Sequence, residues 1–305
     1  MESAALAWRI RRHSIELTHR AEASHIGSVL SVADILAVLY ADILRFRPDQ
    51  PQWPGRDRLI LSKGHAALAL YAALAEVGFF PTEALRSFYQ NGSLLLGHAS
   101  HHVPGVEFST GSLGHGLGAA AGMALGAKLD GAENRIFAIV GDGECNEGSV
   151  WEAAQSAAFF RLDNLTVIVD HNHLQSLDTC ENTMLTGTLA EKWRAFGWSV
   201  AELDGHDHDA LRTALARSHP GRPLAIIAHT VKGKGVPFME NDVLWHYRFP
   251  HAGWEYDAAV AALHAVKPAG AADDYTPEGR KMPECPPILD SALSATYHPV
   301  WRDRL

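Results

Sequence analysis

Apolar residues recur with two different periods along the chain. In residues 4–23 and 31–44 they recur every three or four positions, which predicts two amphipathic helices, the second capped by Ser31. Further along, short apolar runs predict strands at 58–62, 135–140, 165–170, 198–203 and 224–230. Because buried strands that alternate with helices form a parallel sheet with both faces covered, we predict an α/β fold with a doubly wound, mostly parallel sheet flanked by helices.

The regular pattern ends near Val266. Residues 267–305 are Pro-rich and irregular, which predicts an extended C-terminal arm after one large domain over residues 1–266. Within the domain, residues 91–116 are rich in Gly, His and Ser and predict a long loop, and loops of this length are often functional. The small residues of 114–129 predict a helix that packs closely against a sheet or another subunit.

Composition narrows the class of protein. The chain has 305 residues and a net charge of −9 without a dense Lys/Arg cluster, so we expect neither nucleic acid nor a membrane as a partner. No apolar run approaches the ~20 residues of a membrane span. Cys145, Cys180 and Cys285 lack metal-ligand spacing and fit free thiols in a reducing compartment. The N-terminus predicts a helix rather than a secretion signal, so we expect a cytoplasmic protein.

Two polar turns at the ends of predicted strands carry the candidate chemistry. Asp142 lies in a Gly-Asp-Gly turn after one strand, and Asn172 follows the next strand along the chain. Ligands of parallel sheets bind at the carboxyl ends of the strands. Carboxylate, amide and phosphate oxygens are hard ligands that suit Mg²⁺ or Ca²⁺. The two turns together therefore favour a divalent ion that bridges the protein to a diphosphate.

Neighbouring residues fit a diphosphate as well. Gly141 and Gly143 allow a ligand close to the backbone, and the helix that starts near Glu147 offers free N–H groups to an anion. Alternatively, the Gly-Asp-Gly segment is only a tight turn and Asn172 only a turn residue. Neither the dinucleotide fingerprint G-x-G-x-x-G nor the phosphate loop G-x-x-x-x-G-K-[ST] occurs at these turns.

Five segments together resemble one enzyme family. The Gly-Asp-Gly turn with Asn172 thirty residues later resembles the thiamine diphosphate motif. The other four segments are SHIGSVLSVADILAVLY (24–40), RDRLILSKGHAALALYAAL (56–74), GHASHHVPGVEFSTGSLGHGLGAAAGMALGAKL (97–129) and VKGKGVPFMENDVLWH (231–246). In this order they resemble transketolases, and the resemblance covers roughly residues 5–265.

The resemblance implies one chain of a larger enzyme rather than a whole enzyme. The chain resembles the diphosphate-binding, N-terminal subunit of a split transketolase, which transfers a two-carbon ketol unit from a ketose donor to an aldose acceptor through thiamine diphosphate and Mg²⁺ or Ca²⁺. The partner would be a C-terminal transketolase subunit with the pyrimidine-binding and C-terminal domains, in an α₂β₂ assembly. The cofactor-activating Glu and the residues that bind a substrate phosphate are expected on that partner, so sugar or sugar-phosphate specificity is left open.

The resemblance also implies roles for individual residues. The implied metal ligands are Asp142, Asn172 and the main-chain carbonyl of Leu174. The implied cofactor-binding residues are His65, Gly111, Leu113, Gly143, Asn172 and His246. The implied catalytic residues are the substrate-facing His25, His98 and His246, together with Glu147, which would face the activating Glu across the interface.

Histidines suit this chemistry because imidazoles titrate near neutral pH and can both accept a hydroxyl proton and donate to a developing alkoxide. Taken singly, His25, His65 and His98 can equally be turn or core histidines. We assign mainly structural roles to His101, His102, His115, His171, His173, His206, His208 and His229. Residues 204–209, DGHDHD, predict a helix start capped by an acid rather than a metal cluster. Cys145 is expected to be a bystander, and His115 to lie near a subunit contact.

Some residues depart from the family pattern. Tyr247 and Arg248 stand where the split family more often has a small residue after the His, and residues 176–179 replace the usual turn. These departures favour a specialised substrate. Two alternatives remain open. One is the cofactor half of a 1-deoxyxylulose-phosphate-synthase-like or other keto-acid-using enzyme, and the other is a degenerate scaffold subunit.

Overall fold

The computed structural model describes residues 1–184, 186–217 and 219–271, which belong to one compact unit, Met1–Ala271. The C-terminal arm predicted from residue 267 therefore lies outside the described residues from 272 onward, as does Cys285. Within the described ranges, none of the helices is both long and apolar enough to cross a membrane.

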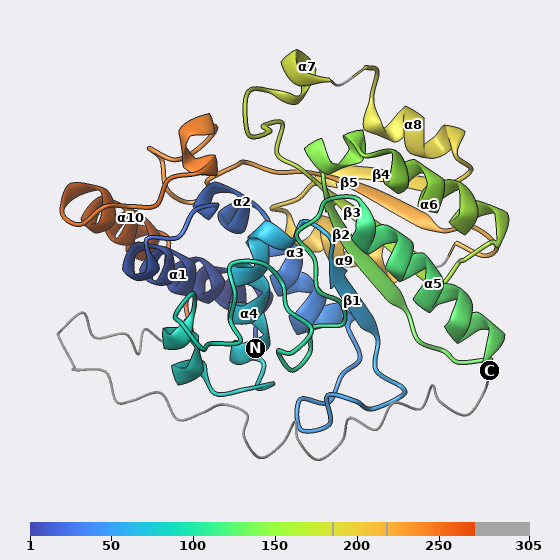
Figure 1. Ribbon diagram of the computed structural model, residues 1–305, viewed down its shortest axis with the longest axis horizontal. Coiled ribbons are helices and arrows are strands. Elements are labelled where there is room, and N and C mark those ends of the chain that lie inside the picture. The colour runs from blue at the N-terminus through green and yellow to red at the C-terminus, as the bar shows by residue number, and fades with distance from the viewer. Residues whose placement is uncertain (185, 218, 272–305) are drawn as a thin grey trace. The chain divides into compact units, whose positions relative to one another are not determined.

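The centre of the unit is a parallel sheet, as predicted. Its strands are β1 (Arg58–Leu61), β2 (Ile136–Gly141), β3 (Leu165–His171), β4 (Ser199–Asp204) and β5 (Leu224–His229). They pair in the order β1-β2-β3-β5-β4, all parallel, and Figure 1 shows the sheet between layers of helices. The predicted α/β class and the predicted strands are therefore confirmed, with boundaries that differ by one or two residues.

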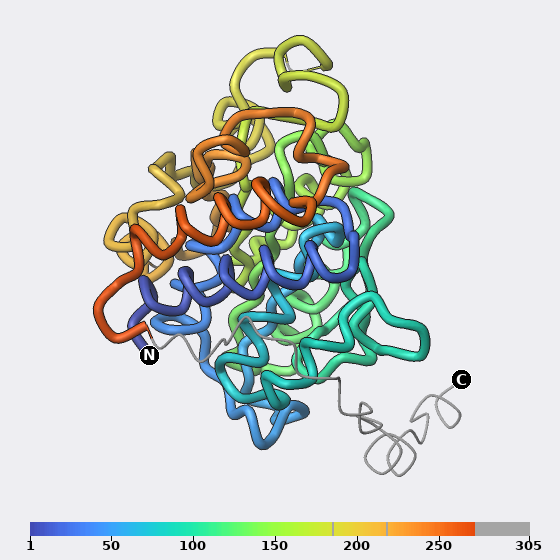
Figure 2. Tube along the Cα trace, turned by 90° about the vertical axis from the view of Figure 1, so that its left-hand side faces the viewer, coloured from blue at the N-terminus to red at the C-terminus, as the bar shows by residue number. Residues whose placement is uncertain are grey.

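The helices connect the strands and extend beyond them. In chain order they are α1 (Ser3–Ala21), α2 (Ile26–Ser31), α3 (Ala33–Val38), α4 (Ala67–Glu76), α5 (His115–Leu129), α6 (Gly148–Phe159), α7 (Cys180–Thr183), α8 (Leu189–Ala195), α9 (His208–Ala216) and α10 (Trp254–Ala265). Figure 2 shows α10 alongside α1, and apolar residues such as Ile15 and Leu263 pack there.

Strand residues alternate between the two faces of the sheet. Ile60, Val140 and Val167 face one layer, where they pack against residues of α5, α6 and α8 such as Leu117 and Trp193. The intervening strand residues are buried as well, with Phe137, Ile139 and Ile168 at most 1% exposed. Both faces of β2 and β3 are therefore covered, whereas the edge strand β4 is partly exposed.

The predicted capping role of Ser31 is wrong. Most of the predicted range is helical, because α3 runs directly into a π-helix at Leu39–Ile43, but Ser31 is the last residue of α2 and Val32 stands at the start of α3. The Ser31 hydroxyl donates to Asp170 Oδ2 at 2.6 Å, with the Ser28 carbonyl 3.1 Å away, and no side chain caps the start of α3. A buried polar partner from a distant strand has overridden the local capping preference.

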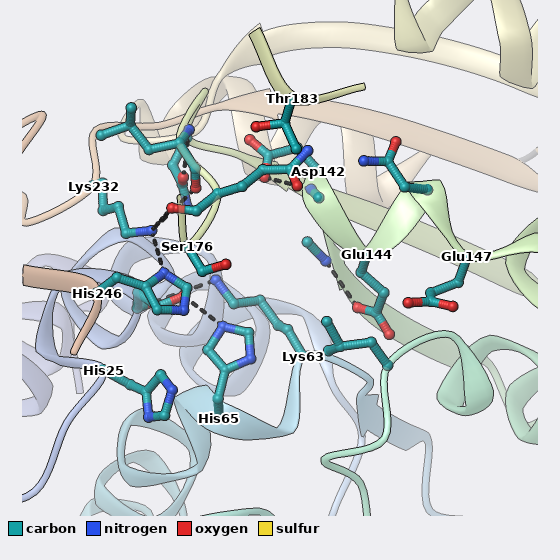
Figure 3. Close-up of a pocket in the computed structure, with 18 of the residues that line it drawn as sticks. His25, Lys63, His65, Asp142, Glu144, Glu147, Ser176, Thr183, Lys232 and His246 are labelled. Atoms are coloured by element: carbon teal, nitrogen blue, oxygen red, sulfur yellow. Dashed lines mark hydrogen bonds between the residues drawn. The ribbon is translucent and has the colours of Figure 1, made fainter. Parts of the chain in front are cut away.

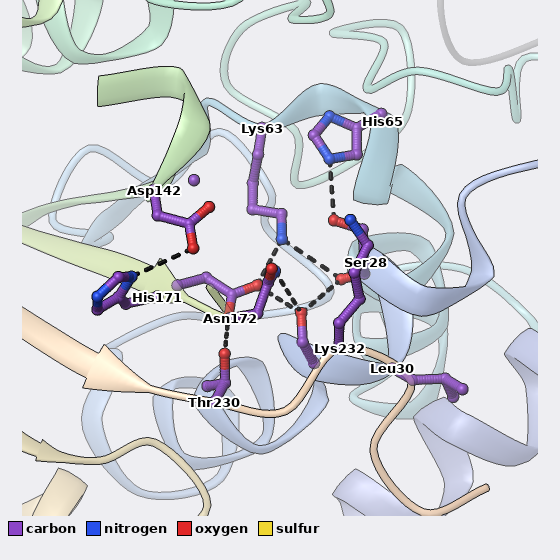
Figure 4. Close-up of polar contacts among 12 residues, drawn as sticks. Ser28, Leu30, Lys63, His65, Asp142, His171, Asn172, Thr230 and Lys232 are labelled. Atoms are coloured by element: carbon purple, nitrogen blue, oxygen red, sulfur yellow. Dashed lines mark hydrogen bonds and ion pairs between the residues drawn. The ribbon is translucent and has the colours of Figure 1, made fainter. Parts of the chain in front are cut away.

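A buried ion pair joins the strands at the carboxyl edge. Lys63, two residues after the end of β1, pairs with Asp170 of β3, and the two side chains are 1% and 0% exposed. Asp170 also accepts from Ser31 and from Thr230, which follows β5 and is labelled in Figure 4. Although burial favours the neutral acid, the charge of Lys63 holds the pKa of Asp170 below its usual value. Four segments distant in sequence thus meet at one carboxylate.

Removal of the lysine charge should destabilise the fold strongly. We expect Lys63→Met to lower the free energy of unfolding by about 3–5 kcal/mol, because it leaves the Asp170 carboxylate buried without its counter-ion. Urea denaturation checks this value. The matched control is Lys128→Met, which breaks the exposed Lys128–Asp163 pair and should cost less than about 1 kcal/mol. Equal losses in the two variants would contradict the role given to the buried pair.

Candidate active site

A cavity of about 490 Å³ opens at the carboxyl edge of the sheet. Its wall contains all the site residues predicted from the sequence, namely His25, His65, His98, Gly111, Leu113, Asp142, Gly143, Glu147, Asn172, Leu174 and His246. These residues come from segments spread over more than two hundred positions. Figure 3 shows imidazoles on one side of the cavity, with Glu144 and Glu147 across from them.

The two polar turns come together as the sheet register requires. Gly141 of β2 pairs with Asp170 of β3, so the residues that follow each strand lie next to each other. Asp142 Oδ1 accepts from the Gly143 N–H at 2.7 Å, and Oδ2 accepts from the His173 N–H at 2.7 Å. Asn172 Oδ1 accepts from the Leu174 N–H at 3.2 Å. The backbone therefore fixes both side chains before any ligand binds.

These donors fit a hard divalent ion. The Asp142 carboxylate, the Asn172 amide oxygen and the Leu174 carbonyl are oxygen ligands of the kind Mg²⁺ and Ca²⁺ prefer. Each oxygen has two lone pairs, so the hydrogen bonds already present leave acceptor capacity on all three residues. Gly143 packs closely against the neighbouring turn, because a Cβ there would lie 2.9 Å from the Gln175 side chain.

Lys232 is a cavity residue that sequence reasoning missed. Its ammonium donates to the carbonyls of Leu174 and Gln175 at 3.1 and 3.3 Å and lies 2.7 Å from His246 Nδ1. Burial, followed by the nearby charge of Lys63, lowers the pKa of Lys232 to about 8. An ammonium in this position attracts an anion, which is consistent with a diphosphate in the cavity.

Four histidines form one cluster in the cavity wall. The ring centroid of His25 lies 5.2 Å from that of His65, 6.0 Å from that of His98 and 5.4 Å from that of His246. His25 has a left-handed backbone (φ 76°), and its N–H donates to the His246 carbonyl at 3.0 Å. His65 lies 2.9 Å from the Ser28 hydroxyl. The fold therefore orients these rings rather than leaving them free.

The cavity keeps three of these imidazoles, those of His25, His65 and His246, neutral. Burial, followed by the charge of His98 and of two lysines, lowers the pKa of His25 to about 4. Burial and Lys232 lower the pKa of His246 to about 3, and burial and Lys63 hold that of His65 well below its usual value. At neutral pH each ring can therefore both donate and accept a hydrogen bond.

A second buried carboxylate, that of Glu144, braces the Gly-Asp-Gly turn. Glu144 Oε1 accepts from the Gly114 N–H at 2.9 Å and from the Ser62 hydroxyl, and Oε2 accepts from the Gly141 N–H at 3.0 Å. Burial raises its pKa despite these bonds. Glu144 thereby connects the predicted loop of residues 91–116, through Gly114, to the turn that contains Asp142.

Glu147 lies at the N-terminus of α6, where a 3₁₀ turn (Gly143–Asn146) leads into the helix. It occupies the capping position but makes no side-chain cap hydrogen bond, and it is exposed at the cavity wall. A negative charge is favourable at a helix N-terminus. Its carboxylate is thus free to meet a group that approaches from outside this chain.

Lys63, Glu144 and Lys232 were missed because the sequence pattern marks charged residues as exposed. A signal was nevertheless present: Lys63 and Lys232 both follow an apolar strand by two or three residues, and Glu144 lies inside the Gly-Asp-Gly-Glu turn. Charged residues at strand ends of a buried parallel sheet are either paired or close to a ligand.

The residues that depart from the family pattern also line the cavity. Tyr247 is 61% exposed, and its ring centroid lies 5.8 Å from that of His25 and 4.7 Å from that of His246. Ser176 lies in the same wall (Figure 3). Arg248 instead pairs with Glu255 at 2.6 Å. Tyr247 and Ser176, but not Arg248, can thus contact a ligand in the cavity.

Several residues given structural roles lie outside the cavity wall. Asp207 caps α9 by accepting from the Asp209 and Ala210 N–H groups, so residues 204–209 are a helix start. His206 and His208 lie 2.6 and 3.0 Å from Asp34, away from the cavity. Cys145 is buried, and burial raises the pKa of its thiol, which agrees with a bystander. His115 is exposed at the start of α5.

Comparisons with known proteins give one consistent family. Residues 3–248 match the family described as "Transketolase, thiamine diphosphate binding domain". The chain is 42% identical to one subunit of the apulose-4-phosphate transketolase of Phocaeicola vulgatus, over 82% of this chain and 89% of that protein. It is 41% identical to one subunit of the 6-deoxy-6-sulfo-D-fructose transketolase of a Clostridium species, over 83% of this chain and 93% of that protein.

Solved structures agree. The transketolase of Campylobacter jejuni superposes with a TM-score of 0.80 at 28% identity, over 88% of this chain and 43% of that one. The chain therefore spans less than half the length of this solved transketolase.

The neutral state of His25 has a consequence for stability. The pKa of His25 is lowered in the folded protein from 6.5 to about 4, so the unfolded chain takes up a proton that the folded chain does not. The folded chain therefore loses stability relative to the unfolded chain as the pH falls from about 6.5 toward about 4, and above about pH 6.5 His25 causes no such loss. We expect His25→Gln to reduce the slope of unfolding free energy against pH in that window, by at most about 1.4 kcal/mol per pH unit.

Urea denaturation of the isolated chain at several pH values between about 7.5 and 4.5 measures this slope. The exposed His115 provides the control variant His115→Gln, which should leave the slope nearly unchanged. If His25→Gln and the wild type lose stability in parallel as the pH falls, the cavity does not hold His25 neutral.

Proposed function

Because the chain belongs to the transketolase family and corresponds to its thiamine diphosphate-binding domain, we propose that it is the diphosphate-binding subunit of a two-chain transketolase. The assembled enzyme transfers a two-carbon ketol unit from a ketose to an aldose. Two relatives that are named as transketolase subunits are covered over 89% and 93% of their length, which supports a division of the enzyme into separate chains.

One observation carries the proposal: oxygen ligands, two lysines and four imidazoles line a single cavity at the carboxyl edge of the sheet. The oxygen donors Asp142, Asn172 and Leu174 suit a divalent ion, Mg²⁺ or Ca²⁺. Lys232 supplies positive charge beside them, and the Gly143 N–H lies at the same turn. This end of the cavity therefore has the chemistry to hold a diphosphate and its metal ion.

The imidazoles form the reacting side of the cavity. When bound, thiamine diphosphate supplies the electron sink for cleavage of the carbon–carbon bond next to a ketose carbonyl. His25, His98 and His246 would orient the hydroxyl groups of the sugar and hold or accept their protons, because imidazole nitrogens can both donate and accept a hydrogen bond. His65, bonded to Ser28, would remain on the diphosphate side.

A second chain completes the site. The exposed Glu147 carboxylate at the start of α6 would face the activating Glu of a C-terminal subunit, and Gly111 and Leu113 would line the cofactor between the chains. We propose an α₂β₂ assembly in the cytoplasm. Sugars or sugar phosphates are the substrates, and the partner contributes the groups that bind a phosphate.

Two alternative functions have less support from the cavity. A keto-acid-using enzyme would need no cluster of imidazoles for sugar hydroxyls, whereas four such rings lie within about 6 Å of their neighbours here. A degenerate scaffold would have no reason to keep Asp142, Asn172, His65 and Glu147 around one cavity. The imidazole cluster therefore favours ketol transfer.

Activity should appear only on assembly. We expect this chain alone, with thiamine diphosphate and Mg²⁺, to show no ketol transfer, and the mixture with its C-terminal partner subunit to cleave a ketose donor in the presence of an aldose acceptor. A coupled assay of product formation checks this. Pyruvate serves as the competing donor and should give no more than background.

Ketose cleavage by this chain alone would contradict the two-chain proposal, whereas turnover of pyruvate in place of ketoses would favour the keto-acid alternative. Assembly of the two chains without turnover of either donor would favour the scaffold.

The metal assignment is tested by cofactor binding. We expect Asp142→Ala to weaken binding of thiamine diphosphate to the assembled complex at least tenfold in the presence of Mg²⁺, because the carboxylate is the one charged ligand among the three donors. Isothermal titration calorimetry measures the affinity. Asp130→Ala, at an exposed acid after α5, should bind like the wild type. Unchanged affinity in Asp142→Ala would show that the ion lies elsewhere.

A further inference from the structure

Three histidines that were given structural roles lie together behind the cavity. His171 ends β3 and His229 ends β5, and the register pairs the two residues directly. His173 follows two residues after His171. One ligand nitrogen from each ring lies within 4.8 Å of the others. The ring centroids are 4.0 Å apart for His171 and His173, 5.2 Å for His171 and His229, and 5.6 Å for His173 and His229.

We propose that His171, His173 and His229 form a binding site for a divalent transition-metal ion, with Zn²⁺ as the best fit. Three neutral imidazoles and one open position form a common tetrahedral zinc site. Imidazole suits Zn²⁺, Cu²⁺ and Ni²⁺, whereas Mg²⁺ and Ca²⁺ prefer oxygen. This site would therefore take a different ion from the one expected at Asp142 and Asn172.

The hydrogen bond of His171 favours a metal ligand. Its Nδ1 lies 3.2 Å from Asp142 Oδ2, and the side chain is 9% exposed (Figure 4). With the proton on Nδ1, the ring donates to the carboxylate and leaves the lone pair of Nε2 for a metal. Metal-ligating histidines usually donate their other N–H to a carboxylate or carbonyl in this way, which fixes the ring orientation and raises its basicity.

The backbone around His173 is also fixed. His173 has a left-handed conformation (φ 66°), which is uncommon for a residue with a side chain. Its N–H donates to Asp142 Oδ2 at 2.7 Å, and its carbonyl accepts from the Cys180 N–H at 2.9 Å. These two bonds hold the turn in the conformation that places the His173 ring beside that of His171.

The remaining adjustment is small. Zinc–nitrogen bonds of about 2.1 Å in a tetrahedron place the ligand nitrogens roughly 3.4 Å apart, so the rings must close inward from their present separation. The side chains of His173 and His229 are 47% and 44% exposed and can rotate. Glu181 and Glu202 lie 4.0 and 3.8 Å from these two rings, and their carboxylates add the negative charge that favours a cation.

The site shares a residue with the active site. Asp142 Oδ2 accepts from His171, while the same carboxylate is the proposed ligand of the cofactor's metal ion. Asn172, another proposed ligand, lies between His171 and His173. Occupation of the three-histidine site would therefore tie the β3 turn to the end of β5 and act on the diphosphate end of the cavity through Asp142.

Zinc binding to the full chain, purified without a histidine tag, tests the proposal. Isothermal titration calorimetry with ZnCl₂ in the absence of thiamine diphosphate should show one ion per chain. We expect His229→Gln and His173→Gln each to weaken this binding at least tenfold, because each removes one of three ligands. The matched control is His251→Gln, at an exposed histidine outside the cluster, which should bind zinc like the wild type.

A second measurement does not depend on calorimetry. Co²⁺ in a tetrahedral site absorbs visible light strongly, so the wild type should show this band and His229→Gln should lose it while its thermal melt in circular dichroism stays cooperative. Zinc affinity that is unchanged in both histidine variants, or the absence of stoichiometric binding, would overturn the proposal. Because neither thiamine diphosphate nor the partner chain is used, the outcome is independent of the proposed ketol transfer.

Discussion

The ion pair between Lys63 and Asp170 is the constraint on which the cavity depends. A fully buried carboxylate in the third strand of a parallel sheet is tolerated because an ammonium and two hydroxyls satisfy it. Those partners follow β1, end α2 and follow β5. His65, Asn172 and Lys232 each lie two residues from Lys63, Asp170 or Thr230. One buried, hydrogen-bonded carboxylate therefore sets the positions of cavity residues that are far apart in the sequence.

Desolvation explains how one cavity can contain both bases and cations. Burial is the largest influence on the pKa of His25, His65, His246 and Lys232, and it disfavours the charged form of each. The lysine charges reinforce this effect on the imidazoles. The resulting cavity has neutral rings beside Lys63 and Lys232, so its positive charge is concentrated on the side where the oxygen ligands would hold a metal ion and an anion.

The fold and much of the cavity could be predicted from the sequence because strand periodicity and turn composition are local signals. Asp142 and Asn172 follow apolar strands, and a parallel sheet must bring such residues to the same edge. The interior charges were missed because hydropathy marks a charged residue as exposed, whereas the buried partners of Lys63 and Glu144, Asp170 and Ser62, are 107 and 82 residues away. The assignment of Ser31 as a helix cap failed for the same reason: its partner, Asp170, is 139 residues away. The roles of individual site residues stay predictions.

Close packing at Gly64 has a consequence for how such proteins diverge. A Cβ there would lie 2.5 Å from the Thr110 carbonyl carbon and 2.6 Å from the Gly111 nitrogen, both of which are backbone atoms. No side-chain rearrangement can relieve such an overlap. The backbone of the turn after β1 and that of the loop at Thr110 and Gly111 therefore cannot change conformation independently of each other. Homologues should therefore inherit the two segments as a unit, and a lineage that lost this glycine would be expected to have rebuilt the loop and, with it, the range of molecules it admits.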